Sequence, residues 1–176
     1  MTMEELLMRG FAARLCLLAI LIAATSPAGA ETLPAPAGEV ILTVDGAIAN
    51  TTDGKEARFD VAALEALGLT TVKTSTPWTD GAVTYEGVLG RVLMEHVGVK
   101  GDKLVARALN DYLADIPIDD FTDYDVILAV KANGAYLPIR DKGPVFVVYP
   151  LDAHPDLRNN TIYSRCVWQL TRLTVQ

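Results

Sequence analysis

Apolar and polar residues alternate in short blocks along most of this chain, a pattern that predicts many short β-strands rather than long helices. Several blocks end at a turn signal, of which Asn133-Gly134 is the strongest and predicts a hairpin. The blocks predicted as strands are residues 39–44, 69–76, 103–109, 126–131, 135–139, 145–149 and 162–175.

Two other segments have the periodicity of amphipathic helices. Residues 87–97 place apolar residues at spacings of three and four on one face, and Gly98 then ends the helix. A shorter helix is predicted at residues 61–67, where Asp60 can cap the first turn. Residues 119–125 are predicted as a short helical turn. Many short strands and few helices predict an α+β fold, a single mixed and mostly antiparallel domain.

Length and composition agree with one globular domain. The chain has 176 residues, 51% of them hydrophobic, and a formal net charge of -7. This length can bury one hydrophobic core, and the hydrophobic content is too high for a disordered chain. The negative charge excludes general nucleic-acid binding. We predict a flexible segment at residues 31–38, which leads into a folded domain at residues 39–176.

Residues 1–30 have the pattern of a signal peptide. Arg9 and Arg14 precede an apolar run at residues 15–24, and residues 28–30 (AGA) form a cleavage site for a signal peptidase. The run of about ten residues is short for a membrane span, which needs roughly 20. We therefore predict cleavage at this site, export to a bacterial periplasm and no membrane span in the mature chain. The alternative is an uncleaved N-terminal anchor.

Removal of the leader leaves Cys166 as the one cysteine of the mature chain, so no internal disulfide can form. Its neighbours Val167 and Trp168 are apolar. A lone thiol in such surroundings is more often buried and inert than reactive, and we predict a structural role for it.

Few residues of this chain indicate catalysis or metal binding. The sequence contains no compact zinc motif, no nucleophile-elbow motif and no glycine-rich phosphate loop. His96 falls on the apolar face of the predicted helix, where a packed histidine is favoured over a ligand, and His154 lies in a loop that can face a cleft. The aspartates within residues 119–125 lack the glycine and glutamate of an EF-hand, which favours a solvated turn over a calcium site.

Two further groups of residues are weaker candidates. Residues 110–112 (NDY) lie between two strand-like blocks and either place an aromatic ring at the edge of a cleft or form a plain turn with a half-buried tyrosine. Basic residues near strand ends are either solvated or, where two or three cluster, able to bind an anion. These basic residues are Lys131, Arg140, Lys142 and Arg165.

Six segments occur in this order along the mature chain: residues 42–46 (LTVDG), 85–89 (YEGVL), 110–117 (NDYLADIP), 126–134 (VILAVKANG), 143–150 (GPVFVVYP) and 165–170 (RCVWQL). In this order they resemble the molybdopterin-binding domain of the sulfite oxidase family. Members of this family carry a G-V pair at the start of the main helix, a D-G-Y segment, an apolar strand ending in N-G, a G-P strand ending in proline and a closing strand with a basic-x-W pattern. No single segment is specific, but together they cover nearly all of the mature chain.

The resemblance implies the family's mixed α+β fold, with a cleft that in active members holds a molybdenum-bound pterin. It also implies a cysteine thiolate, a soft ligand for the metal, near residues 73–78. This sequence has threonine and serine there (KTSTPW), and Cys166 lies in the closing strand instead. Molybdopterin is thus the cofactor that the resemblance implies, but no cysteine ligand supports it.

We expect that the fold is kept while the molybdenum chemistry is lost. The first hypothesis is a non-catalytic periplasmic protein that binds a small molecule, or a membrane-bound signalling or redox protein, through the inherited cleft. The second is a molybdopterin-dependent oxidoreductase with an atypical metal site, and the third is a purely structural or assembly protein. We assign no catalytic or metal-binding residue. The residues expected to line the cleft are Thr74, Thr76, Trp78, Tyr112 and Arg165.

Overall fold

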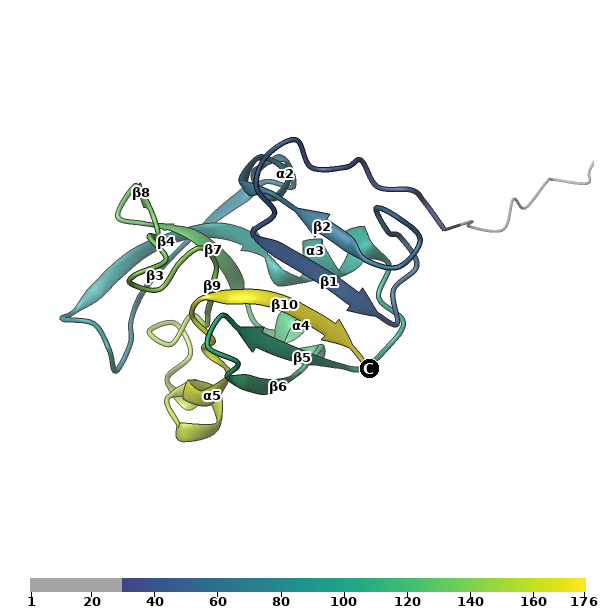
Figure 1. Cartoon of the computed structure of the whole chain (residues 1–176). Coiled ribbons are helices and arrows are strands. Elements are labelled where there is room, and N and C mark those ends of the chain that lie inside the picture. The colour runs from purple at the N-terminus through teal and green to yellow at the C-terminus, as the bar shows by residue number, and fades with distance from the viewer. Residues whose placement is uncertain (1–29) are drawn as a thin grey trace, which may run out of the picture.

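The computed structural model describes residues 30–176, so the predicted signal peptide lies outside the described residues except for its last residue. Two β-sheets contribute to one hydrophobic core, and short helices connect and flank them (Figure 1). The predicted α+β fold, a single and mostly antiparallel domain, is confirmed. Within the described part of the chain, no helix is long and apolar enough to span a membrane.

The first sheet contains both the first and the last strand of the domain. Its strand order is β2-β1-β10-β5-β6, and its neighbouring strands are antiparallel except for the parallel pair β1 and β10. The last strand thus lies at the centre of the sheet (Figure 1). The strands are β1 (Leu42–Gly46), β2 (Ala57–Phe59), β5 (Lys103–Ala108), β6 (Leu113–Pro117) and β10 (Leu170–Val175).

The second sheet has the order β3-β4-β7-β8, and β9 also pairs with β7; its pairs are antiparallel. The predicted hairpin after β7 is confirmed, because Asn133 and Gly134 both have positive φ angles (50° and 80°) and join β7 to β8. The strands are β3 (Leu69–Ser75), β4 (Ala82–Leu89), β7 (Ile127–Ala132), β8 (Ala135–Tyr136) and β9 (Phe146–Val148).

Local sequence signals determine where two of the helices begin or end. The Asp60 carboxylate accepts a hydrogen bond from the backbone N–H of Ala63 at 2.7 Å and caps α2, as predicted. Gly98, with a φ of 62°, ends α3 as predicted. The helices are α2 (Val61–Ala66), α3 (Gly90–Val97), α4 (Asp119–Asp123), the short 3-10 helix η1 (Pro155–Leu157) and α5 (Asn160–Arg165).

Two predicted boundaries are wrong because sheet pairing and a helix cap override the local pattern. The helix predicted from residue 87 begins only at Gly90, since residues 87–89 form the end of β4 and pair with β7, and residues 87 and 88 also pair with β3. The strand predicted from residue 162 begins only at Leu170. Before it, the Asn159 side chain accepts a hydrogen bond from the N–H of Ile162 at 3.1 Å and starts α5.

The segment at residues 31–38 is attached to the domain at both ends. Leu33 is buried, and its N–H donates to the carbonyl of Thr51 at 2.8 Å. The N–H of Gly38 donates to the Asp60 carboxylate at 2.7 Å. These contacts place the segment against the domain, and its flexibility stays a prediction.

Candidate functional site

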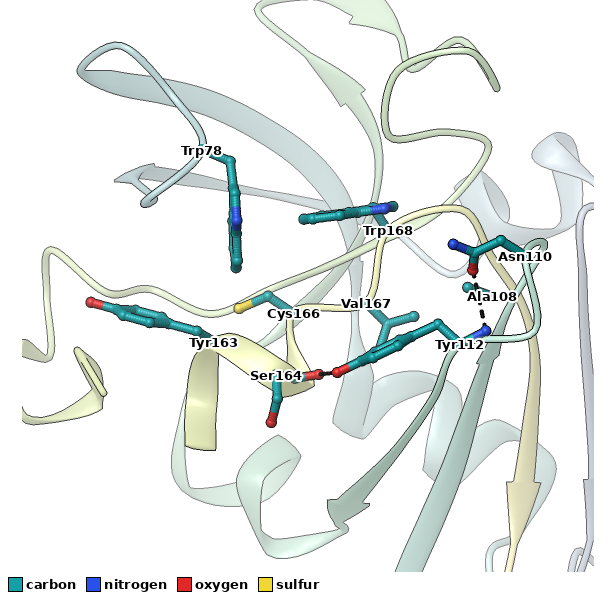
Figure 2. Close-up of a pocket in the computed structure, with 9 residues that line it drawn as sticks. All are labelled: Trp78, Ala108, Asn110, Tyr112, Tyr163, Ser164, Cys166, Val167 and Trp168. Atoms are coloured by element: carbon teal, nitrogen blue, oxygen red, sulfur yellow. Dashed lines mark hydrogen bonds between the residues drawn. The ribbon is translucent and has the colours of Figure 1, made fainter. Parts of the chain in front are cut away.

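A mostly apolar pocket of about 230 Å³ lies between α5, the turn that joins β5 to β6 and the turn that follows β3 (Figure 2). It is open to solvent, because Trp78 and Tyr112 at its edge are 39% and 45% exposed. Among the described residues, those that line the pocket include none with a basic or acidic side chain. They are Trp78, Ala108, Asn110, Tyr112, Tyr163, Ser164, Cys166, Val167 and Trp168.

Aromatic rings form the walls of this pocket. The indoles of Trp78 and Trp168 meet almost at right angles, with an interplanar angle of 85° and ring centroids 5.1 Å apart. The ring of Tyr163 contacts Trp78 in a second edge-on arrangement, at 6.1 Å and 75°. Figure 2 shows that Trp168 and Tyr163 lie on opposite sides of Trp78. The two indole rings therefore form a corner, and Tyr112 lines the same pocket.

Hydrogen bonds hold the wall that Tyr112 provides. Its hydroxyl donates to the backbone carbonyl of Ser164 at 2.9 Å, which ties the β5–β6 turn to α5 (Figure 2). Its N–H donates to the side-chain oxygen of Asn110 at 3.2 Å, and Asp111 between them has a φ of 63°. Such a short polar side chain tolerates the left-handed conformation that this turn requires.

The pocket contains a buried thiol. Cys166 is 4% exposed, and its Sγ lies 3.4 Å from the carbonyl of Ile162, to which it donates. Burial raises the pKa of this thiol to about 12. The thiol is therefore buried, as predicted, and almost entirely protonated at neutral pH.

Next to the pocket, polar groups connect the end of β3 to the loop after β9. We call Thr74, Ser75, Asp152 and Arg158 the β3 clasp. The Asp152 carboxylate accepts from the Ser75 hydroxyl at 2.7 Å and from the Ser75 N–H at 3.0 Å, and it also pairs with Arg158. The N–H of Asp152 donates to the hydroxyl of Thr74 at 3.1 Å. The Ser75 hydroxyl and Arg158 hold the pKa of Asp152 below its usual value.

A second polar network lies in the interior behind α5. The Asp120 carboxylate accepts from the Tyr149 hydroxyl at 2.6 Å and from the Arg165 guanidinium at 2.8 Å. Burial, followed by the hydrogen bond to Asp120, raises the pKa of Tyr149. This network fixes α5, which carries one wall of the pocket, to α4 and to the residue that follows β9.

The residues predicted to line the cleft have different positions in the structure. Trp78 and Tyr112 both line the pocket. Thr74 is fully buried in the β3 clasp, and Thr76 holds the next turn, with its hydroxyl 3.2 Å from that of Thr79. Arg165 points to Asp120 instead of the pocket. These three residues support the walls without lining them.

Sequence reasoning missed Tyr163 and Trp168, because both fell within a segment predicted to be one continuous strand. The sequence did contain a signal for them, because Tyr163 and Trp168 are aromatic residues on either side of Cys166. When the chain turns between them, both rings line the same pocket. The prediction that Tyr112 lies at the edge of a cleft was a better guide to the pocket, since Tyr112 provides the wall on the side of the β5–β6 turn.

The other polar candidates are engaged elsewhere. His96 is half-buried 6.1 Å from the ring of Phe59, and His154 contacts the ring of Tyr124 edge-on at 5.2 Å. In residues 30–176, no group of three or more His, Cys, Asp or Glu side chains could hold a metal ion. Three of the basic candidates have separate acidic partners and so do not form a common anion site. These pairs are Lys131–Glu65, Lys142–Asp141 and Arg165–Asp120.

Comparison with known proteins assigns the domain to a family. A model of the oxidoreductase molybdopterin binding domain matches residues 54–152, more than half of the chain, and the protein belongs to this family. The predicted resemblance to the sulfite-oxidase-type domain is thereby confirmed. No curated protein matches the sequence.

A solved structure supports the same fold. The crystal structure of the sulfane dehydrogenase SoxCD from Paracoccus pantotrophus matches with a TM-score of 0.56 and 23% sequence identity. The match covers 76% of this chain and 37% of that chain, so this protein spans well under half of the length of its structural neighbour. At this identity the likeness concerns the fold alone.

The described residues do not fit the molybdenum ligand that the resemblance implies. The end of β3 offers only hydroxyls, and Thr74, Ser75 and Thr76 each use theirs in hydrogen bonds to protein groups. A protonated hydroxyl is a poor substitute for a soft thiolate. Cys166 is on α5's side of the pocket, is protonated at neutral pH and bonds to Ile162.

Proposed function

We propose that this protein is a non-catalytic member of its family that binds a small molecule in the aromatic pocket. The observation that carries the proposal is the contrast between an open apolar pocket and a strand end whose hydroxyls are all hydrogen-bonded. Concave sites with aromatic walls and a few polar groups are the usual form of ligand sites in proteins.

Binding is favoured over catalysis by the chemistry of the lining residues. They include no side chain that is charged at neutral pH, and their single thiol has a pKa raised to about 12. General acid–base or nucleophilic catalysis needs a group that titrates or ionises near the working pH. The pocket offers instead ring faces, one carboxamide, serine and tyrosine hydroxyls and backbone groups, which orient a ligand; the Ser164 hydroxyl itself donates to the carbonyl of Thr161 at 2.7 Å.

The proposal includes the cellular setting. Residues 1–30 support export to the periplasm through a cleaved signal peptide. A periplasmic binding protein without its own membrane span needs a partner that responds to its ligand-bound state. A membrane-bound signalling or redox protein fits this role. The exposed Leu109 and Leu113 beside the pocket are candidates for that contact.

A second function is supported by family membership: a molybdopterin-dependent oxidoreductase with an atypical metal site. It requires a ligand set that differs from the family's thiolate.

Metal and pterin analysis separates the two functions. Protein purified from the cell that naturally makes it should contain far less than one molybdenum and one pterin per chain, and native mass spectrometry should show a bound small molecule. A Trp78→Ala variant should lose that molecule. The matched control is Tyr136→Ala, which removes an exposed ring at the β7–β8 hairpin, outside the pocket. Stoichiometric molybdenum would overturn the proposal.

A further inference from the structure

We infer that the ligand of the aromatic pocket is a small organic cation whose trimethylammonium-type group lies in the corner between Trp78 and Trp168. The inference rests on the proposed binding function and specifies the chemistry of its ligand. Three properties of the pocket carry it: ring geometry, charge and size.

The ring geometry presents two electron-rich faces to one point. Trp78 and Trp168 meet at 85° with ring centroids 5.1 Å apart, and both line the pocket together with Tyr112 (Figure 2). The face of an aromatic ring is the negative end of its quadrupole, and indole attracts cations most strongly. A tetrahedral group with methyl arms touches both faces at once. A flat heterocycle can stack on only one of two perpendicular faces.

The charges around the pocket exclude an anionic ligand group. None of the lining side chains is basic, and the guanidinium groups of Arg107, Arg158 and Arg165 each have a carboxylate partner. Arg165 pairs with Asp120 at 2.8 Å, and Arg158 pairs with Asp152 in the β3 clasp. The chain as a whole carries a net charge of -7, which attracts cations. A quaternary ammonium needs no carboxylate partner, since it has no N–H to donate.

The size of the pocket selects a small ligand. Its volume of about 230 Å³ is below the roughly 300–1,000 Å³ of sites for drug-sized molecules. A choline-sized cation with a short polar arm fits this volume. The carboxamide of Asn110 lines the same pocket and can bond that arm.

Fluorescence titration tests the inference directly, because the chain has two tryptophans and both line the pocket. The probes are choline and 3,3-dimethylbutan-1-ol, which has the same shape with carbon in place of the charged nitrogen. We expect choline to bind at least tenfold more tightly, roughly the factor that a desolvated cation–π contact provides. Equal or tighter binding of the neutral alcohol would contradict the inference that the ligand is a cation, but it would still support binding of a small molecule in this pocket. If choline does not bind, the inference that the ligand is a small organic cation is contradicted as well.

Matched variants locate the contact. Trp78→Leu should weaken choline binding about tenfold and remove the preference over the alcohol. Trp78 is 39% exposed, so this change leaves the fold intact, and Trp168 remains to report binding. Tyr136→Leu, an aromatic replacement outside the pocket, should leave the affinity unchanged. Retention of the preference in Trp78→Leu contradicts the inferred position. The molybdenum content of protein purified from its natural source is measured independently of these titrations. Failure of the cation inference can therefore be distinguished from failure of the proposed binding function.

Discussion

The β3 clasp and the aromatic pocket are separated by only four positions, from Thr74 to Trp78, yet they are opposite in character. In the clasp, each hydroxyl at the strand end is bonded to a group from the loop after β9. In the pocket, Trp78 leaves its ring 39% exposed with a corner open to solvent. The strand end where the resemblance implies a metal ligand is closed, and the open surface lies beside it.

This difference assigns separate roles to neighbouring residues. Hydrogen bonds between the strand end and the loop after β9 stabilise the fold, whereas open aromatic surface is available to a ligand. Changes in the clasp and in the α5 network should therefore reduce stability, and changes in the pocket should reduce binding. The following predictions test that separation, from the largest expected effect to the smallest.

The largest effect is expected for the reactivity of Cys166. Its pKa, raised from 9.0 to about 12, lowers the thiolate fraction at pH 8 about a thousandfold relative to the unfolded chain. Alkylation by iodoacetamide should slow by a similar factor in the folded protein and recover in urea. A Cys16→Ser background leaves Cys166 as the only cysteine. Equal alkylation rates in the folded and unfolded states would show that Cys166 is reactive in the pocket. That result would contradict the assignment of the pocket to binding alone.

Asp120→Ala should cause the largest loss of stability. The change leaves the Arg165 guanidinium and the Tyr149 hydroxyl without their buried partner, at a cost of about 3–5 kcal/mol in the free energy of unfolding. Urea unfolding measures this loss. Asp123→Ala, an exposed position on the same helix, is the matched control and should cost less than about 0.5 kcal/mol. Similar losses in both variants would contradict a structural role for the network.

Thr74→Val and Trp78→Ala separate the clasp from the pocket. Thr74→Val keeps the shape but leaves the N–H of Asp152 without its acceptor, which should reduce the free energy of unfolding by about 1–3 kcal/mol and leave binding in place. Trp78→Ala should abolish binding with a smaller loss of stability. Urea unfolding and ligand titration on both variants provide the measurement. The reverse pattern would show that the two regions act as one.

The smallest effect is expected from the pH dependence of the clasp. Because the pKa of Asp152 is lower in the folded state than its ordinary value of 3.8, its contribution is present above pH 3.8 and is lost as the pH falls through the lowered pKa. The carboxylate is partly exposed, so the loss should stay below about 1 kcal/mol. Urea unfolding at pH 6 and pH 3 should show a smaller decrease for Asp152→Asn than for the wild type. An equal decrease would contradict the assignment, and Asp156→Asn serves as an exposed control.

Local interactions made part of the fold predictable. The Asp60 cap, the end of α3 at Gly98 and the Asn133-Gly134 hairpin each depend on residues a few positions apart. The start of α3 was predicted wrongly because residues 87–89 pair with β7, which is distant in sequence, and residues 87 and 88 also pair with the preceding strand β3. Periodicity within the segment contains no information about those partners.

The candidate site shows the same division. Trp78 and Tyr112, which the sequence predicts as cleft residues, both line the pocket, and each combines an aromatic ring with a turn. Arg165, predicted as a cleft residue, pairs instead with Asp120, which lies 45 positions away in the chain. Trp168 and Tyr163 could be recognised as pocket residues only in the structure, where the chain forms α5 at the beginning of the segment predicted as a strand.

The central position of β10 determines when the domain can form. Residues 170–175 lie between β1 and β5, so a growing polypeptide that has not yet produced them has neither the parallel pair with β1 nor the antiparallel pair with β5. The first sheet therefore closes only after nearly the whole domain has been synthesised. A chain that postpones folding in this way leaves the edges of β1 and β5 without their partner strand until translation of the domain is nearly complete.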